Sequence, residues 1–200
     1  GGQHILAAGP GQSLRLWERE GTSATPVASF PQRSSVLALQ SEGAGPDLLQ
    51  TQHTDGFVRR WESAGSSWAQ QSRVEIDVPT HHPVLFLSSH PGMLAIGVDG
   101  MVRQLDSDGH ATRLLSTDQP AHSIAVAQRE ERLFIGRGDG SLSILDLNSG
   151  EPITHLDLHS GAIRQLAAHP EEKELAWVDD RNRVLRLDLS TDPHQPFISH

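Results

Sequence analysis

Short apolar runs alternate along the whole chain with segments rich in Gly, Pro, Ser and Asp. Representative runs are Val84–Leu87, Leu94–Gly97, Val102–Leu105 and Thr112–Leu115. An apolar stripe with helical spacing never continues over ten or more positions. Short apolar runs bounded by turn residues are typical of β-strands. The pattern therefore predicts an all-β chain without helices.

The predicted strands belong to a repeat that extends over the whole chain. Five positions, separated by 40 to 44 residues, have the same surroundings, and we call them the anchors: Trp17, Trp61, Leu105, Leu145 and Leu187. Each anchor is followed by Asp or Glu, and Leu or Val stands three positions before it. A leucine stands eleven or twelve positions before it. Self-similarity with this period is typical of repeat architectures such as propellers.

Units two, three and four contain a turn signal before their anchors. Asp55-Gly56, Asp99-Gly100 and Asp139-Gly140 stand six and five positions before their anchors. Asp-Gly between two strands indicates a hairpin, because glycine accepts the positive φ of a tight turn. With the apolar runs on either side, units two to five contain four strands each, and the first unit contains three because it lacks the innermost. The predicted units are 1–31, 32–80, 81–119, 120–158 and 159–200.

Both faces of the predicted sheets are apolar. The anchor and the residue three positions before it lie on opposite faces of the third strand. A sheet with two apolar faces must be covered on both sides. Similar neighbouring sheets provide that cover if they stack radially around an axis, as the blades of a β-propeller do. We therefore predict an all-β propeller of four-stranded antiparallel blades.

Two segments resemble the WD-repeat family. Residues 49–62, LQTQHTDGFVRRWE, resemble its signature, and residues 159–170, HSGAIRQLAAHP, resemble its opening His and first strand. The resemblance extends over essentially all 200 residues and implies a β-propeller. A related propeller family with similar spacing is the alternative.

The repeats also depart from the WD-repeat pattern. Leu replaces Trp at three anchors, and Arg181-Asn182 and Gly11-Gln12 replace Asp-Gly in units five and one. In well-formed WD repeats, a His, a Ser or Thr, the turn Asp and the Trp form a buried hydrogen-bonded network. No unit clearly keeps all four, so we expect apolar packing to supply most of the blade stability.

The strand count predicts an incomplete ring. Nineteen strands are expected, so five complete blades would need one more inner strand. Rings of WD repeats more often have seven blades. We therefore expect the chain to be part of a larger, seven-bladed ring, and a five-bladed ring with a damaged first blade is the alternative.

Composition narrows the possible partners and settings. The formal net charge is −9, which argues against a surface that holds nucleic acid. Cysteine is absent, which excludes disulfides, thiolate zinc sites and cysteine nucleophiles. No apolar run approaches the 18 residues of a membrane-spanning helix. We expect a cytoplasmic protein that binds neither membranes nor nucleic acid.

Other residue groups have simpler interpretations than chemistry. His81, His82 and His90 suggest a metal, but adjacent histidines on a strand point to opposite faces, so we predict no metal site. Arg137-Gly138-Asp139 coincides with a predicted turn, and no Gly-x-Ser-x-Gly elbow is present. We expect no cofactor and no enzymatic activity.

The predicted function is that of a non-catalytic scaffold or regulatory module of a larger protein, binding other proteins or other domains of the same polypeptide. WD-repeat propellers commonly bind partners on the face formed by two sets of loops, those between strands two and three and those between blades. Eight residues map to these loops: Arg33, Thr54, His82, Val98, His122, Arg137, His159 and Arg181. The alternative is a propeller enzyme or small-ligand sensor with its site in the central channel.

Overall fold

The computed structural model describes residues 4–9, 13–20, 22–31, 34–41, 48–64, 67–80, 82–87, 92–115, 119–127, 131–169, 174–189 and 198–199. Within these ranges, every regular element is a β-strand. The predicted all-β class is therefore confirmed.

The strands form five antiparallel sheets, in each of which neighbours in the sheet are neighbours in the chain. The first sheet contains β1 (His4–Gly9), β2 (Ser13–Glu20) and β3 (Ser23–Pro31). The second contains β4 (Val36–Ser41), β5 (Leu48–His53), β6 (Phe57–Ala64) and β7 (Ser67–Glu75). The third contains β8 (Leu85–Phe86), β9 (Met93–Ile96), β10 (Val102–Leu105) and β11 (Ala111–Leu115).

The last two sheets have four strands each. The fourth contains β12 (Ala121–Ala127), β13 (Arg132–Arg137), β14 (Ser141–Asp146) and β15 (Pro152–Asp157). The fifth contains β16 (Ile163–Ala168), β17 (Glu174–Asp179), β18 (Val184–Asp188) and β19 (Ile198–Ser199). The prediction of four-stranded antiparallel units is confirmed in these two sheets and in the second and third.

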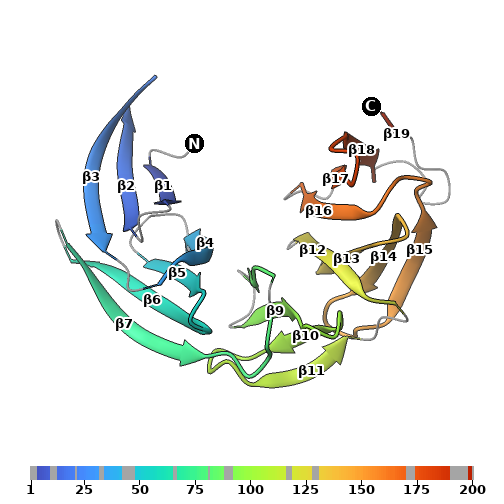
Figure 1. The fold of residues 1–200 in the computed structure, drawn as a ribbon, viewed down its shortest axis with the longest axis horizontal. Helices are drawn as coiled ribbons and strands as arrows, with labels where there is room; N and C mark the ends of the chain where they lie inside the picture. The colour runs from blue at the N-terminus through green and yellow to red at the C-terminus, as the bar shows by residue number, and fades with distance from the viewer. Residues whose placement is uncertain are drawn as a thin grey trace.

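The five sheets follow one another along an arc (Figure 1). The strands β4, β12 and β16 lie on the inner side of the arc, and β3, β7, β11 and β15 lie on its outer rim. The first and fifth sheets stand at the two ends, which do not meet within the described residues. The arc therefore has one free face at each end.

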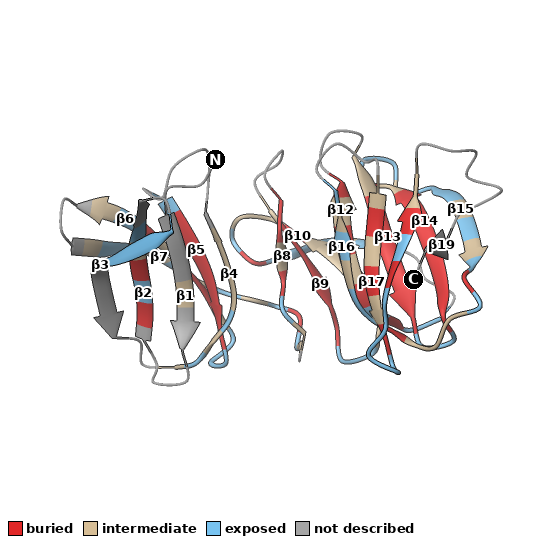
Figure 2. Ribbon diagram, turned by 90° about the horizontal axis from the view of Figure 1, so that it is seen from above, coloured by how far each residue is buried: buried red, intermediate tan, exposed pale blue. Residues whose placement is uncertain are grey.

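Outer strands differ most from the sequence prediction. The apolar run at 74–76 predicts a short strand, whereas β7 begins at Ser67 and pairs with β6 over its whole length. An outermost strand has a neighbour on one side only and much of it is exposed, as β15 is (Figure 2). Such a strand needs few apolar residues, so hydrophobicity alone underestimates its length.

Among the described residues, three hydrophobic clusters each lie between two consecutive sheets. One joins the second and third sheets, one the third and fourth, and one the fourth and fifth. Alternate residues of β9 belong to different clusters: Met93 and Ala95 face the second sheet, and Leu94 and Ile96 face the fourth. The predicted packing of both faces is therefore present in the third sheet, because strand alternation sends successive side chains to opposite sides.

One repeat column shows the effect of a missing neighbour. The residue three positions before the anchor is almost inaccessible in four sheets, where it is Leu14, Val58, Val102 or Leu142 (0%, 4%, 0% and 0% exposed). In the fifth sheet the same position is Val184, whose exposure is 67%. The side chain is apolar in every unit, so its burial depends on whether another sheet follows.

This column predicts a matched pair of stability effects. Val102→Ala removes buried methyl groups between the third and fourth sheets and is expected to lower the free energy of unfolding by about 2 kcal/mol. The same substitution at exposed Val184 is expected to change it by less than about 0.5 kcal/mol. Urea denaturation of both variants measures the difference, and equal effects would contradict the packing described.

Candidate functional site

Four hairpin turns, each joining the two middle strands of a sheet, share one construction. In each, a backbone N–H donates to the carbonyl three residues earlier, and the donor residue has a positive φ. The donor is a glycine in three of the turns: Gly56, Gly100 and Gly140. In the turn of the fifth sheet the donor is Asn182, whose φ is 58°. Asparagine is among the few other residues that tolerate this conformation. Asn182 therefore replaces the expected glycine without changing the turn.

A carboxylate fixes each of these turns. Asp99 Oδ1 accepts the N–H of Met101 at 3.0 Å, and Asp139 does the same for Ser141 at 2.9 Å. The Arg103 guanidinium donates to Asp99 Oδ1 at 2.8 Å, and this hydrogen bond holds the pKa of Asp99 well below its usual range. The aspartates predicted from Asp-Gly therefore stabilise the turns and are engaged by their own hairpins.

In the fifth sheet the carboxylate comes from Asp179, which the repeat pattern did not identify. Asp179 is completely buried and accepts the N–H groups of Arg181 and Arg183, each at 2.9 Å. The Arg183 guanidinium also lies 2.7 Å from its Oδ2. Burial would raise the pKa of Asp179, but these hydrogen bonds outweigh it and lower the pKa. The sequence signal is that Asp179 stands eight positions before its anchor Leu187, whereas the turn aspartates of units two to four stand six positions before theirs.

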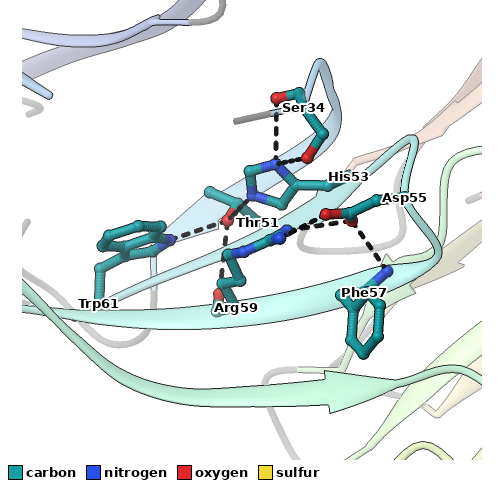
Figure 3. A network of polar contacts seen from close by, with 7 residues as sticks. All are labelled: Ser34, Thr51, His53, Asp55, Phe57, Arg59 and Trp61. Atoms are coloured by element: carbon teal, nitrogen blue, oxygen red, sulfur yellow. Dashed lines mark hydrogen bonds and ion pairs between the residues drawn. The ribbon is translucent and has the colours of Figure 1, made fainter. Parts of the chain in front are cut away.

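The second sheet contains a buried polar network (Figure 3). The Trp61 indole N–H donates to Thr51 Oγ1 at 2.9 Å, and Thr51 Oγ1 lies 2.8 Å from His53 Nε2. His53 Nδ1 lies 3.3 Å from the Ser34 carbonyl. The Ser34 hydroxyl lies 3.2 Å from the same nitrogen, and the Thr51 hydroxyl lies 3.5 Å from the Arg59 carbonyl, so both ring nitrogens of His53 have polar partners. The sheet thus keeps three of the four expected members, with the histidine on β5 itself, whereas the carboxylate of the turn residue Asp55 pairs with Arg59.

Two electrostatic effects surround this network. Burial lowers the pKa of His53 below its ordinary value of 6.5, and the positive charge of Arg59 lowers it further. Hydrogen bonds from Arg59 lower the pKa of Asp55 to about 2, with the Ser34 hydroxyl acting in the same direction. The network therefore holds a neutral imidazole next to the ion pair of Arg59 and Asp55. The side chains of the network form their hydrogen bonds with one another.

The two sets of loops predicted to bind partners lie against each other. The Thr54 N–H, in the β5–β6 turn, donates to the Ser35 carbonyl before β4 at 2.9 Å. The Val98 N–H, in the β9–β10 turn, donates to the Pro79 carbonyl before β8 at 3.0 Å. We call the surface formed by these turns and connections the loop face. Its backbone is held by hydrogen bonds between segments that are distant in the sequence.

The candidate residues occupy different environments on this face. Thr54, Val98, His159 and Arg181 are exposed, and Val98 has an exposure of 61%. His82 is half-buried in the connection before β8. These five residues are therefore on the turns and connections where the repeat places them, and their role in binding stays a prediction.

Three candidates differ from the predicted placement. Arg137 is the last residue of β13 and is buried (6% exposed), and its Nη1 donates to His155 Nδ1 at 3.2 Å. It is therefore a structural residue of the fourth sheet and is a poor contact for a partner. His122 is exposed but lies within β12 and not in a loop. Arg33 lies outside the described residues.

A cavity of about 570 Å³ opens on the inner side of the arc. It is lined by residues from or next to the inner strands β4, β8, β12 and β16, together with residues of β9, β17 and β18. The lining is mostly apolar, and its ionisable members are His82, His122 and Arg164. No Asp or Glu is among the described residues that line it. The sequence predicted that the innermost strands line a central channel, with Arg164 and Gln165 in their polar segment, and both residues line the cavity.

The described residues contain no cluster of three or more His, Asp or Glu side chains that could hold a metal ion. None of their elements is a helix of the length and apolarity that a membrane span requires. Comparison of the chain with protein-family models finds no match, and comparison with curated proteins finds none either. The interpretation of the site therefore depends on its own geometry.

The His53 network predicts a specific pH dependence of stability. Because the folded state lowers the pKa of His53, the unfolded state binds the proton more readily, and stability falls as the pH drops below 6.5. This loss is expected to be smaller in His53→Gln. Urea denaturation at a series of pH values measures it.

His110 supplies the control of opposite sign. Its hydrogen bond with Asp77, at 2.8 Å, raises the pKa of this exposed imidazole. Its contribution to stability is therefore present below pH 6.5 and lost as the pH rises through the raised pKa. His110→Gln should make the chain more sensitive to acid, whereas His53→Gln makes it less sensitive. A shift in the same direction for both variants would refute the assignment.

Proposed function

We propose that the chain is a segment of a WD-repeat-like β-propeller that works as a non-catalytic interaction module. Its partners are other proteins or other domains of the same polypeptide, and they bind on the loop face. The main support is the backbone hydrogen bonding between turns and connections, which holds exposed Thr54 and Val98 in fixed positions. Loops that are already ordered lose little conformational entropy when a partner binds.

The same proposal includes a larger ring, of seven blades. Exposed Val184 supports it, because this position is 0–4% exposed in all four units that have a following sheet, from Leu14 to Leu142. A further four-stranded unit beyond the fifth sheet would cover Val184 in the same way. The grouping of strands into blades at 1–31, 32–80, 81–119, 120–158 and 159–200 follows from this interpretation. A cytoplasmic setting stays a prediction from the cysteine-free sequence.

The second candidate function is binding of a ligand in the central channel. The observation that favours it is the cavity of about 570 Å³ at the inner strands. This volume lies within the range of about 300–1,000 Å³ that is typical of ligand pockets. The described residues of its lining offer a guanidinium and imidazoles and include no carboxylate. Such a set suits the binding of an acidic group more than acid–base chemistry by paired carboxylates.

Affinity capture with two matched variants tests the proposed function. The loop-face variant combines Thr54→Arg, Val98→Glu and Arg181→Glu. The rim variant combines Leu114→Glu and Ile153→Glu, at residues that are 57% and 52% exposed on the outer strands β11 and β15. Both sets change exposed side chains, so both variants should fold.

A partner captured by the wild-type chain from its native lysate should bind the rim variant equally. It should bind the loop-face variant at least tenfold more weakly, because introduced charges at an interface centre are costly. Titration of the captured partner measures both affinities. Equal binding by the loop-face variant, or loss of binding only in the rim variant, would exclude the loop face as the docking surface.

A further inference from the structure

The inner cavity differs in charge from the rest of the molecule. The chain contains 25 Asp and Glu residues against 16 Lys and Arg, for a net charge of −9. Among the described residues that line the cavity, the only residue with a permanent charge is Arg164, on the inner strand β16. The cavity is therefore a locally basic region of an acidic protein, and an acidic ligand would enter it without meeting a carboxylate in the lining.

A recurring backbone irregularity determines which residues reach this region. The pairing register shifts at the second residue of three inner strands, β4, β12 and β16. The residues at these shifts are Leu37, His122 and Arg164, and all three are exposed. An extra residue in one strand of a pair re-aims its side chain. In β12 and β16 this residue is basic or ionisable and lines the cavity.

Arg164 is available to bind a ligand. Other arginines are engaged: Arg59, Arg103 and Arg183 each pair with the carboxylate of their own hairpin. Arg164 is exposed and makes no hydrogen bond or ion pair with any described residue. A guanidinium binds a carboxylate through two parallel hydrogen bonds, which makes Arg164 suited to an acidic group.

The apolar part of the lining supplies a second contact. It includes Leu39, Leu85, Ile124 and Leu166 from four different inner strands. Trp177, 1% exposed, also borders the cavity, and its indole N–H has no hydrogen-bond partner among the described residues. A buried donor without a partner is costly, and a carbonyl or carboxylate acceptor is the group that satisfies it.

We propose that this cavity binds an acidic peptide segment, in which an Asp or Glu carboxylate pairs with Arg164 beside His122 and a neighbouring apolar side chain occupies the lining. A peptide supplies both groups. The inference deepens the second candidate function, on which it rests, because it assigns the chemistry of the ligand in the central channel.

Selection from random heptapeptides displayed on phage tests this proposal with the intact chain. The wild-type chain should enrich peptides that contain Asp or Glu next to a large apolar residue. Ala167→Trp, which fills the cavity from an exposed position on β16, should abolish the enrichment. Fluorescence anisotropy of a labelled enriched peptide then gives its affinity for each variant.

The matched pair is Arg164→Gln and Arg186→Gln, which remove the same charge from the same sheet. Arg186 is exposed on β18, pairs with Glu174 at the surface and does not line the cavity. Arg164→Gln should weaken peptide binding at least tenfold, and Arg186→Gln should change it less than twofold. Absence of enrichment over Ala167→Trp, enrichment without an acidic preference, or equal effects of the two substitutions would overturn the proposal.

The outcomes also separate this inference from the proposed function. If the chain captures a partner through the loop face while the library yields no acidic peptides, only the cavity assignment fails. If acidic peptides bind through Arg164 and the loop-face variant still captures every partner, the loop face is wrong and the cavity assignment stands.

Discussion

The architecture depends on sheets that are apolar on both faces. In the third sheet, Leu94 faces one neighbour and Met93 the other, so the sheet cannot be solvated on either side without exposing large side chains. Stacking along an arc satisfies this constraint for every internal sheet. It leaves one uncovered face at each end, where Val184 is exposed although its counterparts are buried. Stability of this kind is a sum of contacts between nearest neighbours.

Polar interactions have a different role, which is to position the loops. Each of the four described hairpin turns between middle strands is fixed by a carboxylate, and the β5–β6 and β9–β10 turns are hydrogen-bonded to the connections before β4 and β8. The Trp61–Thr51–His53 network in the second sheet adds buried hydrogen bonds to apolar packing. The side chains left for partners are those that these internal contacts do not use, such as Val98 on the loop face and Arg164 at the cavity.

The repeat predicted the strand class, the antiparallel grouping and the two apolar faces, because these follow from local periodicity. It missed features that depend on partners distant in the sequence or on one-residue shifts. Asp179, two positions earlier in its unit, replaces the turn aspartate of the other units. Arg137 on β13 is buried and donates to His155 on β15, which is separated from β13 in the sheet by β14. The shifts at His122 and Arg164 leave no signal in the sequence, although they determine what reaches the cavity.

Hydrogen exchange of the chain with Leu142→Ala tests the central claim most directly. Leu142 lies in the cluster between the fourth and fifth sheets, so its truncation weakens one interface only. Nearest-neighbour packing predicts lower amide protection in β12–β19 and unchanged protection in β4–β7. Equal loss of protection in all sheets, or no loss in β16–β19, would contradict the claim that each sheet is stabilised by the sheets beside it.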